Sequence, residues 1–190
     1  MLCAGGGGGG RGKEEVRVTC RVFPAVVTTP QVRVWAWDNP EHILKVEVPA
    51  FAGRIIDLDW DPESKRIVVV GEGREFSAKC FMWDTGNSVG EMVGHTKRIV
   101  TCAYKPNRPY RIMTGGEDFK TCFYSGPPFK LAHSNGSVHT KEVWCVRYSP
   151  DGTKLVSVGS DRRLVFYDAK EGVKTMEVAE GSEGAHVGSI

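Results

Sequence analysis

Two sets of side chains in this sequence have the types that build hydrolytic or metal sites. Each set combines a histidine, a hydroxyl, a carboxylate and a tyrosine; the sets are His95, Thr114, Asp118 and Tyr124, and His139, Ser157, Asp161 and Tyr167. Such groups can activate a nucleophile or bind zinc. The two histidines are 44 residues apart, and in each set the acid lies six positions before the tyrosine. Because the constellation recurs, it indicates a structural hydrogen-bond relay within a repeat.

The segments that must position these side chains repeat at the same interval. Three β-rich runs end in prolines 44 residues apart; they are 54–62, 98–106 and 142–150. A second apolar run follows each of them. A third run then follows and contains an aromatic residue near its end; the third runs are 81–84, 122–125 and 165–168. A period of about 44 residues with several short strands and almost no helical periodicity is typical of four-stranded propeller blades. The sequence therefore predicts an all-β propeller.

The blades are predicted to occupy residues 31–190. Residues 1–30 contain a run of six glycines and no blade-like spacing, so we expect a flexible N-terminal segment there. Residues 32–38 resemble the end of one more blade, and Ala185-His186 resembles the start of another. The sequence therefore predicts about three and a half four-stranded blades. They would form an incomplete ring within a longer protein. Because an incomplete ring leaves strand edges bare, we expect the isolated chain to self-associate or to need the missing blades of the same propeller.

Composition excludes several classes of function. A formal net charge of +2 gives no strong field for nucleic acid or anionic lipid. No run approaches the roughly 20 apolar residues that cross a bilayer, and no secretory signal precedes the blades. The six cysteines form no CxxC pair, which favours reduced, structural thiols. We predict no catalytic residue, no metal site and no cofactor.

The repeat resembles the WD-repeat family. The residues that carry the resemblance are Gly94-His95, Trp83-Asp84, and Ser160-Asp161 with Tyr167-Asp168. It implies a non-enzymatic, protein-binding propeller in which each histidine lies between a strand hydroxyl, a turn carboxylate and the ring that ends the third strand. The first full blade lacks this relay, because Ser77 stands six positions before Trp83. We expect that blade to depend on packing.

A closer resemblance is to the actin-interacting protein 1 family, also called the WD repeat-containing protein 1 family. It rests on Gly-Glu-Gly-Arg-Glu within 69–75, Arg-Pro-Tyr-Arg at 108–111, Gly-Pro-Pro-Phe-Lys at 126–130 and Ser-Pro-Asp-Gly at 149–152. The resemblance implies two joined propellers that bind cofilin-decorated actin filaments and promote their disassembly. This chain would be part of the N-terminal propeller. The implied partners are actin filaments and cofilin/actin-depolymerizing factor, and the implied location is the cytoplasmic actin cytoskeleton.

Two short segments are candidates for partner binding. The connection that contains Glu72 is longer than a tight hairpin needs, and in a WD blade it opens on the same face as the loops containing His95 and His139. Acidic groups there could meet basic partner surfaces. After the Gly-Pro-Pro turn, an aromatic ring beside a cation is a common hot-spot composition, although this ring could equally pack into its own blade. The candidates are Glu72, Arg74, Glu75, Glu117, Phe129 and Lys130.

Two other functions are compatible with propeller blades in general. A generic WD scaffold for complexes in signalling or ubiquitin transfer would keep every blade motif but none of the family-specific loops. An enzyme would need a cluster of titratable groups outside the repeated relay, and the sequence contains no such cluster. Binding is therefore the favoured class of function.

Overall fold

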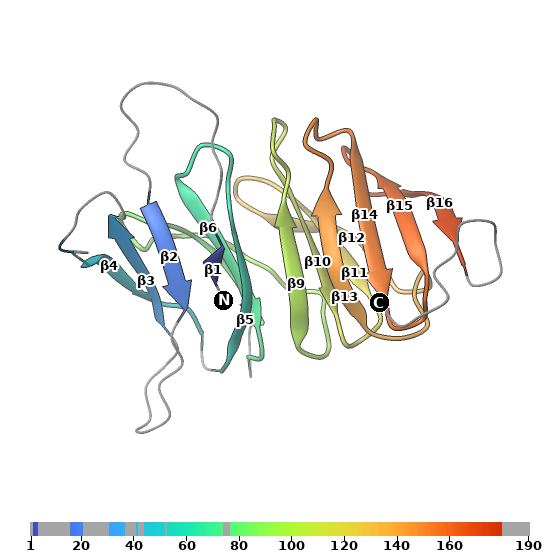
Figure 1. The fold of residues 1–190 in the computed structure, drawn as a ribbon, viewed down its shortest axis with the longest axis horizontal. Coiled ribbons are helices and arrows are strands. Elements are labelled where there is room, and N and C mark those ends of the chain that lie inside the picture. The colour runs from blue at the N-terminus through green and yellow to red at the C-terminus, as the bar shows by residue number, and fades with distance from the viewer. Residues whose placement is uncertain are drawn as a thin grey trace.

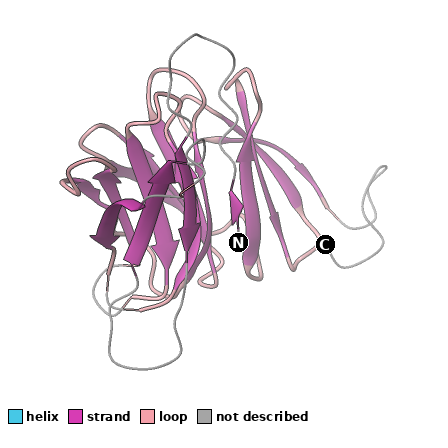
Figure 2. Cartoon of the chain, turned by 60° about the vertical axis from the view of Figure 1, so that its left-hand side comes forward, coloured by secondary structure: helices cyan, strands magenta, loops and turns pink. Residues whose placement is uncertain are grey.

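In the part of the chain that the structure describes, the fold consists of four antiparallel sheets of four strands each (Figures 1 and 2). The computed structural model describes residues 2–3, 16–20, 31–36, 41, 44–51, 53–73 and 77–179, and within these ranges every regular element is a β-strand. In each sheet the strands pair in chain order. The predicted all-β class and four-stranded blades are confirmed, and we name the sheets blades 1 to 4.

The strands of blades 2 to 4 have four to six residues each, whereas β1 of blade 1 has two. Blade 1 contains β1 (Leu2–Cys3), β2 (Val16–Cys20), β3 (Gln31–Ala36) and β4 (Leu44–Pro49). Blade 2 contains β5 (Ile55–Trp60), β6 (Arg66–Gly71), β7 (Ala78–Met82) and β8 (Ser88–Glu91). Blade 3 contains β9 (Ile99–Tyr104), β10 (Arg111–Gly116), β11 (Thr121–Ser125) and β12 (Lys130–Asn135). Blade 4 contains β13 (Val143–Tyr148), β14 (Lys154–Gly159), β15 (Leu164–Asp168) and β16 (Lys174–Val178).

Blade 1 extends into the segment for which the sequence predicts flexibility. Within residues 1–30 the structure describes β1 and β2, and β2 pairs with β3 along its whole length, with Val18 opposite Val34. The sequence Val-Arg-Val-Thr-Cys at 16–20 alternates apolar and polar residues, as a half-buried strand does. The six-glycine run lies outside the described residues. The first sheet thus has four strands, where the sequence predicts only the end of a blade.

The described residues form three hydrophobic core clusters, each of which lies between two neighbouring blades. One cluster joins blades 1 and 2, a second joins blades 2 and 3, and the third joins blades 3 and 4. Strand β6 serves two of them, because successive side chains of a strand point to opposite faces. Ile67 and Val69 pack toward blade 1, whereas Val68 and Val70 pack toward blade 3, and all four are 0% exposed. Burial on both faces explains why β6 is a continuous apolar run.

Hydrogen bonds also join the first strands of blades 2 and 3. Asp57 accepts the backbone N–H of Cys102 at 3.0 Å, and Asp59 accepts that of Tyr104 at 2.7 Å. These donors lie on the edge of β9 that no strand of blade 3 covers. The two carboxylates therefore satisfy buried edge groups that would otherwise have no partner. Blade 2, for which the sequence predicts reliance on packing alone, thus uses polar contacts with blade 3 as well.

Candidate protein-binding surface

The relay of blade 4 is complete. Nδ1–H of His139 donates to both carboxylate oxygens of Asp161 at 3.1 Å, and Nε2 shares a 2.7 Å hydrogen bond with the Ser157 hydroxyl. That hydroxyl lies 2.9 Å from the hydroxyl of Tyr167. His139 is only 3% exposed, and the backbone N–H of Thr140 donates to the same carboxylate at 2.9 Å. The relay therefore fixes the loop between β12 and β13 onto its blade.

The relay of blade 3 has a backbone contact at its last member. His95 lies 2.9 Å from Asp118 through Nδ1 and 2.8 Å from the Thr114 hydroxyl through Nε2, as in blade 4. The hydroxyl of Tyr124, however, donates to the carbonyl of Val93 at 3.0 Å. Tyr124 thus ties the loop before His95 directly to β11. The described residues contain no group of three or more histidine, cysteine, aspartate or glutamate side chains that could hold a metal ion.

The His95–Asp118 pair makes stability depend on pH. Burial lowers the pKa of His95, but the interactions with Asp118 and Cys122 together outweigh burial, and the pKa rises from 6.5 to about 9. Because the folded chain holds the proton more tightly than the unfolded chain, this stabilisation is complete below pH 6.5 and is lost as the pH rises through about 9. We expect a loss on the order of 2 kcal/mol over this range.

The measurement is urea unfolding at a series of pH values, with His95→Gln as the control. This variant keeps a polar side chain but has no titrating group, so the decline between pH 6.5 and 9 should be much smaller. An identical decline in the variant would assign the pH dependence to another group.

Two of the predicted acidic residues gather around one arginine. Glu72 is exposed in the turn after β6, and Glu117 is half-buried in the equivalent turn after β10. Glu117 forms an ion pair with Arg98 at the start of blade 3. Glu117 and, at longer range, Glu72 raise the pKa of Arg98. The predicted residues Arg74 and Glu75 lie outside the described residues.

Phe129 and Lys130 lie apart from these acids. Glu117 precedes β11 and Phe129 follows it, so the two residues are at opposite ends of that strand. Lys130 is exposed, but Phe129 is only 1% exposed and its ring lies edge-on to Tyr104 at a centroid distance of 5.5 Å. Of the two roles left open for Phe129, the structure supports packing in the core between blades 2 and 3.

Trp144 is a candidate that the sequence pattern did not reveal. Its side chain is 46% exposed, and its indole N–H donates to the hydroxyl of Ser160. It occupies a β-bulge of β13, which adds one residue and re-aims a side chain. Bulges at the equivalent positions of β5 and β9 contain Ile56 and Val100, both only half-buried. Comparing these three positions would have singled out the large aromatic residue.

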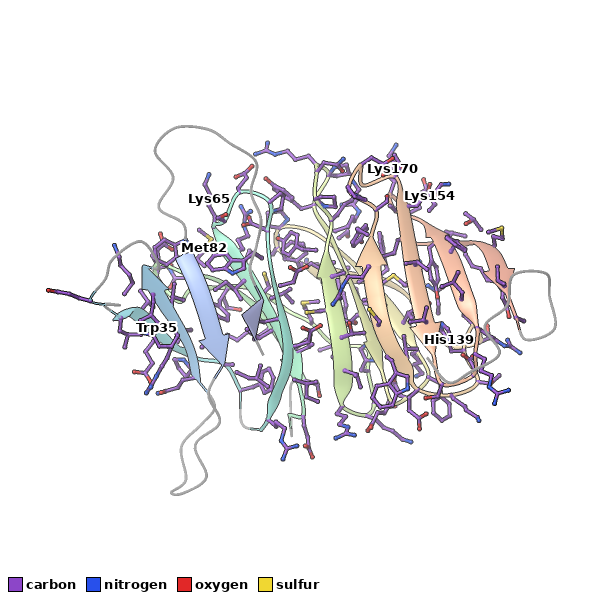
Figure 3. All side chains as sticks on the ribbon, viewed as in Figure 1. Trp35, Lys65, Met82, His139, Lys154 and Lys170 are labelled. Atoms are coloured by element: carbon purple, nitrogen blue, oxygen red, sulfur yellow. The ribbon has the colours of Figure 1, made fainter. Side chains whose placement is uncertain are left out.

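Trp144 lies at the same end of the blades as Glu72 and Glu117. The backbone N–H of Glu72 donates to the carbonyl of Arg54, that of Glu117 to Arg98, and that of Ser160 to Glu142, at 2.8, 3.1 and 2.9 Å. These bonds make the three turns structurally equivalent. Figure 3 shows His139 at this end, away from Lys65, Lys154 and Lys170 at the opposite end. We name this end the relay end.

The repeated relays and four-stranded sheets define a WD-repeat propeller. In agreement, the WD domain, G-beta repeat family matches residues 86–125 and 132–168. The described residues contain no helix long and apolar enough to cross a membrane.

Comparison with known proteins shows which WD-repeat proteins this chain is similar to. The chain is 46% identical over 163 residues to WD repeat-containing protein 1-B of Xenopus laevis, covering 86% of this chain and 26% of the relative. It is 47% identical over 160 residues to WD repeat-containing protein 1 of Rattus norvegicus and 46% identical over 162 residues to Actin-interacting protein 1-2 of Arabidopsis thaliana, each covering 84% of this chain and 26% of the relative. The predicted resemblance is confirmed: the chain is a relative of WD repeat-containing protein 1 and actin-interacting protein 1. It spans about a quarter of their length.

Proposed function

We propose that this chain is part of an actin-binding WD-repeat protein and that the longer protein promotes cofilin-dependent disassembly of actin filaments. The observation that supports this is its 46% identity to a relative whose name states an interaction with actin. The proposed partners are actin filaments and cofilin/actin-depolymerizing factor, in the cytoplasmic actin cytoskeleton. Binding is favoured over catalysis because the side chains of the two relay histidines, His95 and His139, are only 1% and 0% exposed, which leaves a substrate no access to them.

The relay end is the proposed contact surface. It combines an exposed acid, Glu72, an ion pair between Arg98 and Glu117, and the exposed ring of Trp144. Tryptophan and arginine are enriched among residues that dominate binding energy, and charges at the edge of a contact contribute mainly to the rate of association. Arg74 and Glu75 remain proposed contacts because they follow Glu72 in the same connection. Lys130 would require a second contact at the opposite end.

Co-sedimentation with actin filaments tests the proposed function. The chain, extended to a closed propeller if it self-associates, is mixed with filaments in the presence and absence of cofilin. Cofilin-dependent pelleting is the expected result. A folded protein that stays in the supernatant under both conditions would favour the generic scaffold function instead.

Changing Trp144 to alanine is expected to weaken this pelleting. A centrally placed tryptophan typically contributes 2 kcal/mol or more, so we expect the apparent dissociation constant to rise about 30-fold. Val173→Ala is the matched control, because Val173 is a similarly exposed apolar residue, at 53%, in the turn after β15 at the opposite end. If both variants bind like the unchanged chain, Trp144 is not part of the contact.

A further inference from the structure

Two cations face each other where blade 3 turns from β9 to β10. The backbone N–H of Lys105 donates to the carbonyl of Arg111 at 2.9 Å, which makes the two residues a directly opposed cross-strand pair. Side chains of such a pair lie on the same face of the hairpin, and like charges there repel. In blade 2 the equivalent pair is Asp61 and Arg66, which form an ion pair at 2.8 Å. Blade 3 thus has two positive charges where blade 2 has one of each sign.

Lys105 and Arg111 both donate hydrogen bonds to uncharged acceptors. Lys105 is only 4% exposed, and its ammonium group donates to the carbonyl of Asn107 at 3.2 Å and to the side-chain oxygen of the same residue. Arg111 donates to the carbonyls of Lys170 and Tyr110, at 3.2 and 2.8 Å. A buried cation surrounded only by neutral acceptors is costly unless a negative charge compensates it.

The nearest compensating charge in the described part of the chain is Asp168 of blade 4. Burial lowers the pKa of Lys105, the charge of Arg111 lowers it further, and Asp168 opposes both effects. Asp168 is exposed, and its carboxylate accepts the backbone N–H groups of Lys170 and Glu171, both at 2.9 Å. No ion pair joins Asp168 to either cation among these residues. At longer range, the Asp168 carboxylate therefore only partly compensates the charge of Lys105.

A further possible donor lies within electrostatic range of Arg111. The hydroxyl of Tyr148, on the first strand of blade 4, is buried and has no hydrogen-bond partner among the described residues. Burial raises the pKa of Tyr148 and the charge of Arg111 opposes this rise, which places the hydroxyl within electrostatic range of the guanidinium group. An unpartnered buried hydroxyl near a cation can donate to an anion bound there.

We propose that the end of blade 3 that faces blade 4 binds a small tetrahedral oxyanion such as inorganic phosphate, with Lys105, Arg111 and the Tyr148 hydroxyl as donors. The anion takes the place of the carboxylate that Asp61 supplies in blade 2. It ties the two blades together at the end opposite the relays. This site is independent of actin binding.

Thermal unfolding of the full chain tests the proposal. Melting temperatures are measured in phosphate and in chloride at equal ionic strength, and phosphate binding is followed by isothermal titration calorimetry. The unchanged chain should show a melting temperature that rises and then saturates with phosphate concentration. In K105D, which reproduces the opposite-charge pair of blade 2, we expect no saturable rise and no binding heat, with a melting temperature in chloride at least equal to that of the unchanged chain.

Two further variants complete the test. K105M removes the cation without adding an acid and should also lose phosphate binding. K154M changes an exposed lysine at the equivalent hairpin of blade 4 and should keep it. If phosphate raises the melting temperature of K105D as much as that of the unchanged chain, the effect is general exclusion of the salt from the surface and the proposal is wrong. Absence of binding heat for the unchanged chain would also overturn it, since Asn107 and Asp168 would then be sufficient for Lys105.

Discussion

The Phe129→Ala variant is expected to lower the free energy of unfolding by about 3–5 kcal/mol. The Phe129 ring is 1% exposed and belongs to the core cluster between blades 2 and 3, where it lies edge-on to Tyr104. Removing it takes buried apolar surface from the core and leaves a cavity that the surrounding β-sheets, held by their own hydrogen bonds, can close only in part. Urea unfolding followed by circular dichroism measures the loss.

Lys130→Ala is the natural control for this prediction. Lys130 is the next residue and is exposed, so its removal should change the free energy of unfolding by less than about 0.5 kcal/mol. The pair of variants separates the two roles that the sequence leaves open for Phe129. A Phe129→Ala chain of normal stability that no longer binds filaments would show that the ring contacts a partner, contrary to its position in the core.

The burial of Phe129 could not be predicted from its local sequence. Its backbone N–H donates to the carbonyl of Val89 at 3.0 Å, a contact between residues 40 positions apart in different blades. The approach is close because Gly90 has no side chain: a Cβ there would lie 2.8 Å from the backbone nitrogen of Phe129. Such a contact depends on how two blades are placed relative to each other. The repeat period predicts that the blades are neighbours but not which turn residues meet.

Most of the fold, by contrast, could be predicted from the period alone. The spacing of Pro62, Pro106 and Pro150 gives the number and phase of blades 2 to 4. The period predicts blade 1 only in part, because the β1 strand of two residues and the 12 residues between β1 and β2 do not follow the regular spacing. The strand β2 could still be found, since Val16 and Val18 alternate with polar residues.

The candidate surface was predicted less completely than the relays. The relay groups, a histidine, a hydroxyl and a carboxylate, can be recognised from residue type and from a spacing that recurs in the repeat. Once the blade fold is predicted, it follows that these side chains contact one another. The Tyr124 hydroxyl donates to the carbonyl of Val93, and backbone acceptors have no sequence signature. The exposure of Trp144 does not follow from simple strand alternation, because a bulge, which shifts the pleat by one residue, decides which side chains of β13 face solvent.

We expect the side chains of the blade 4 relay to stabilise the fold cooperatively. In His139→Ala, the Asp161 carboxylate and the Ser157 hydroxyl both lose a buried partner, so we expect the free energy of unfolding to fall by about 3 kcal/mol. Ser157→Ala alone should cost less, about 1–2 kcal/mol, because it removes the group that lies between His139 and Tyr167 without leaving a carboxylate unpaired.

A double-mutant cycle separates a relay from independent contacts. Once His139 is absent, Ser157 has already lost one of its two side-chain partners, so the second substitution should cost about 1 kcal/mol less than it does in the unchanged chain. Val68→Ala is the matched control for additivity, because Val68 is buried between blades 2 and 3 and belongs to a different core cluster. Its cost should be the same with and without His139. Equal costs for Ser157→Ala in both backgrounds would mean that the histidine and the hydroxyl act independently, and that the repeated spacing reflects local geometry without coupling.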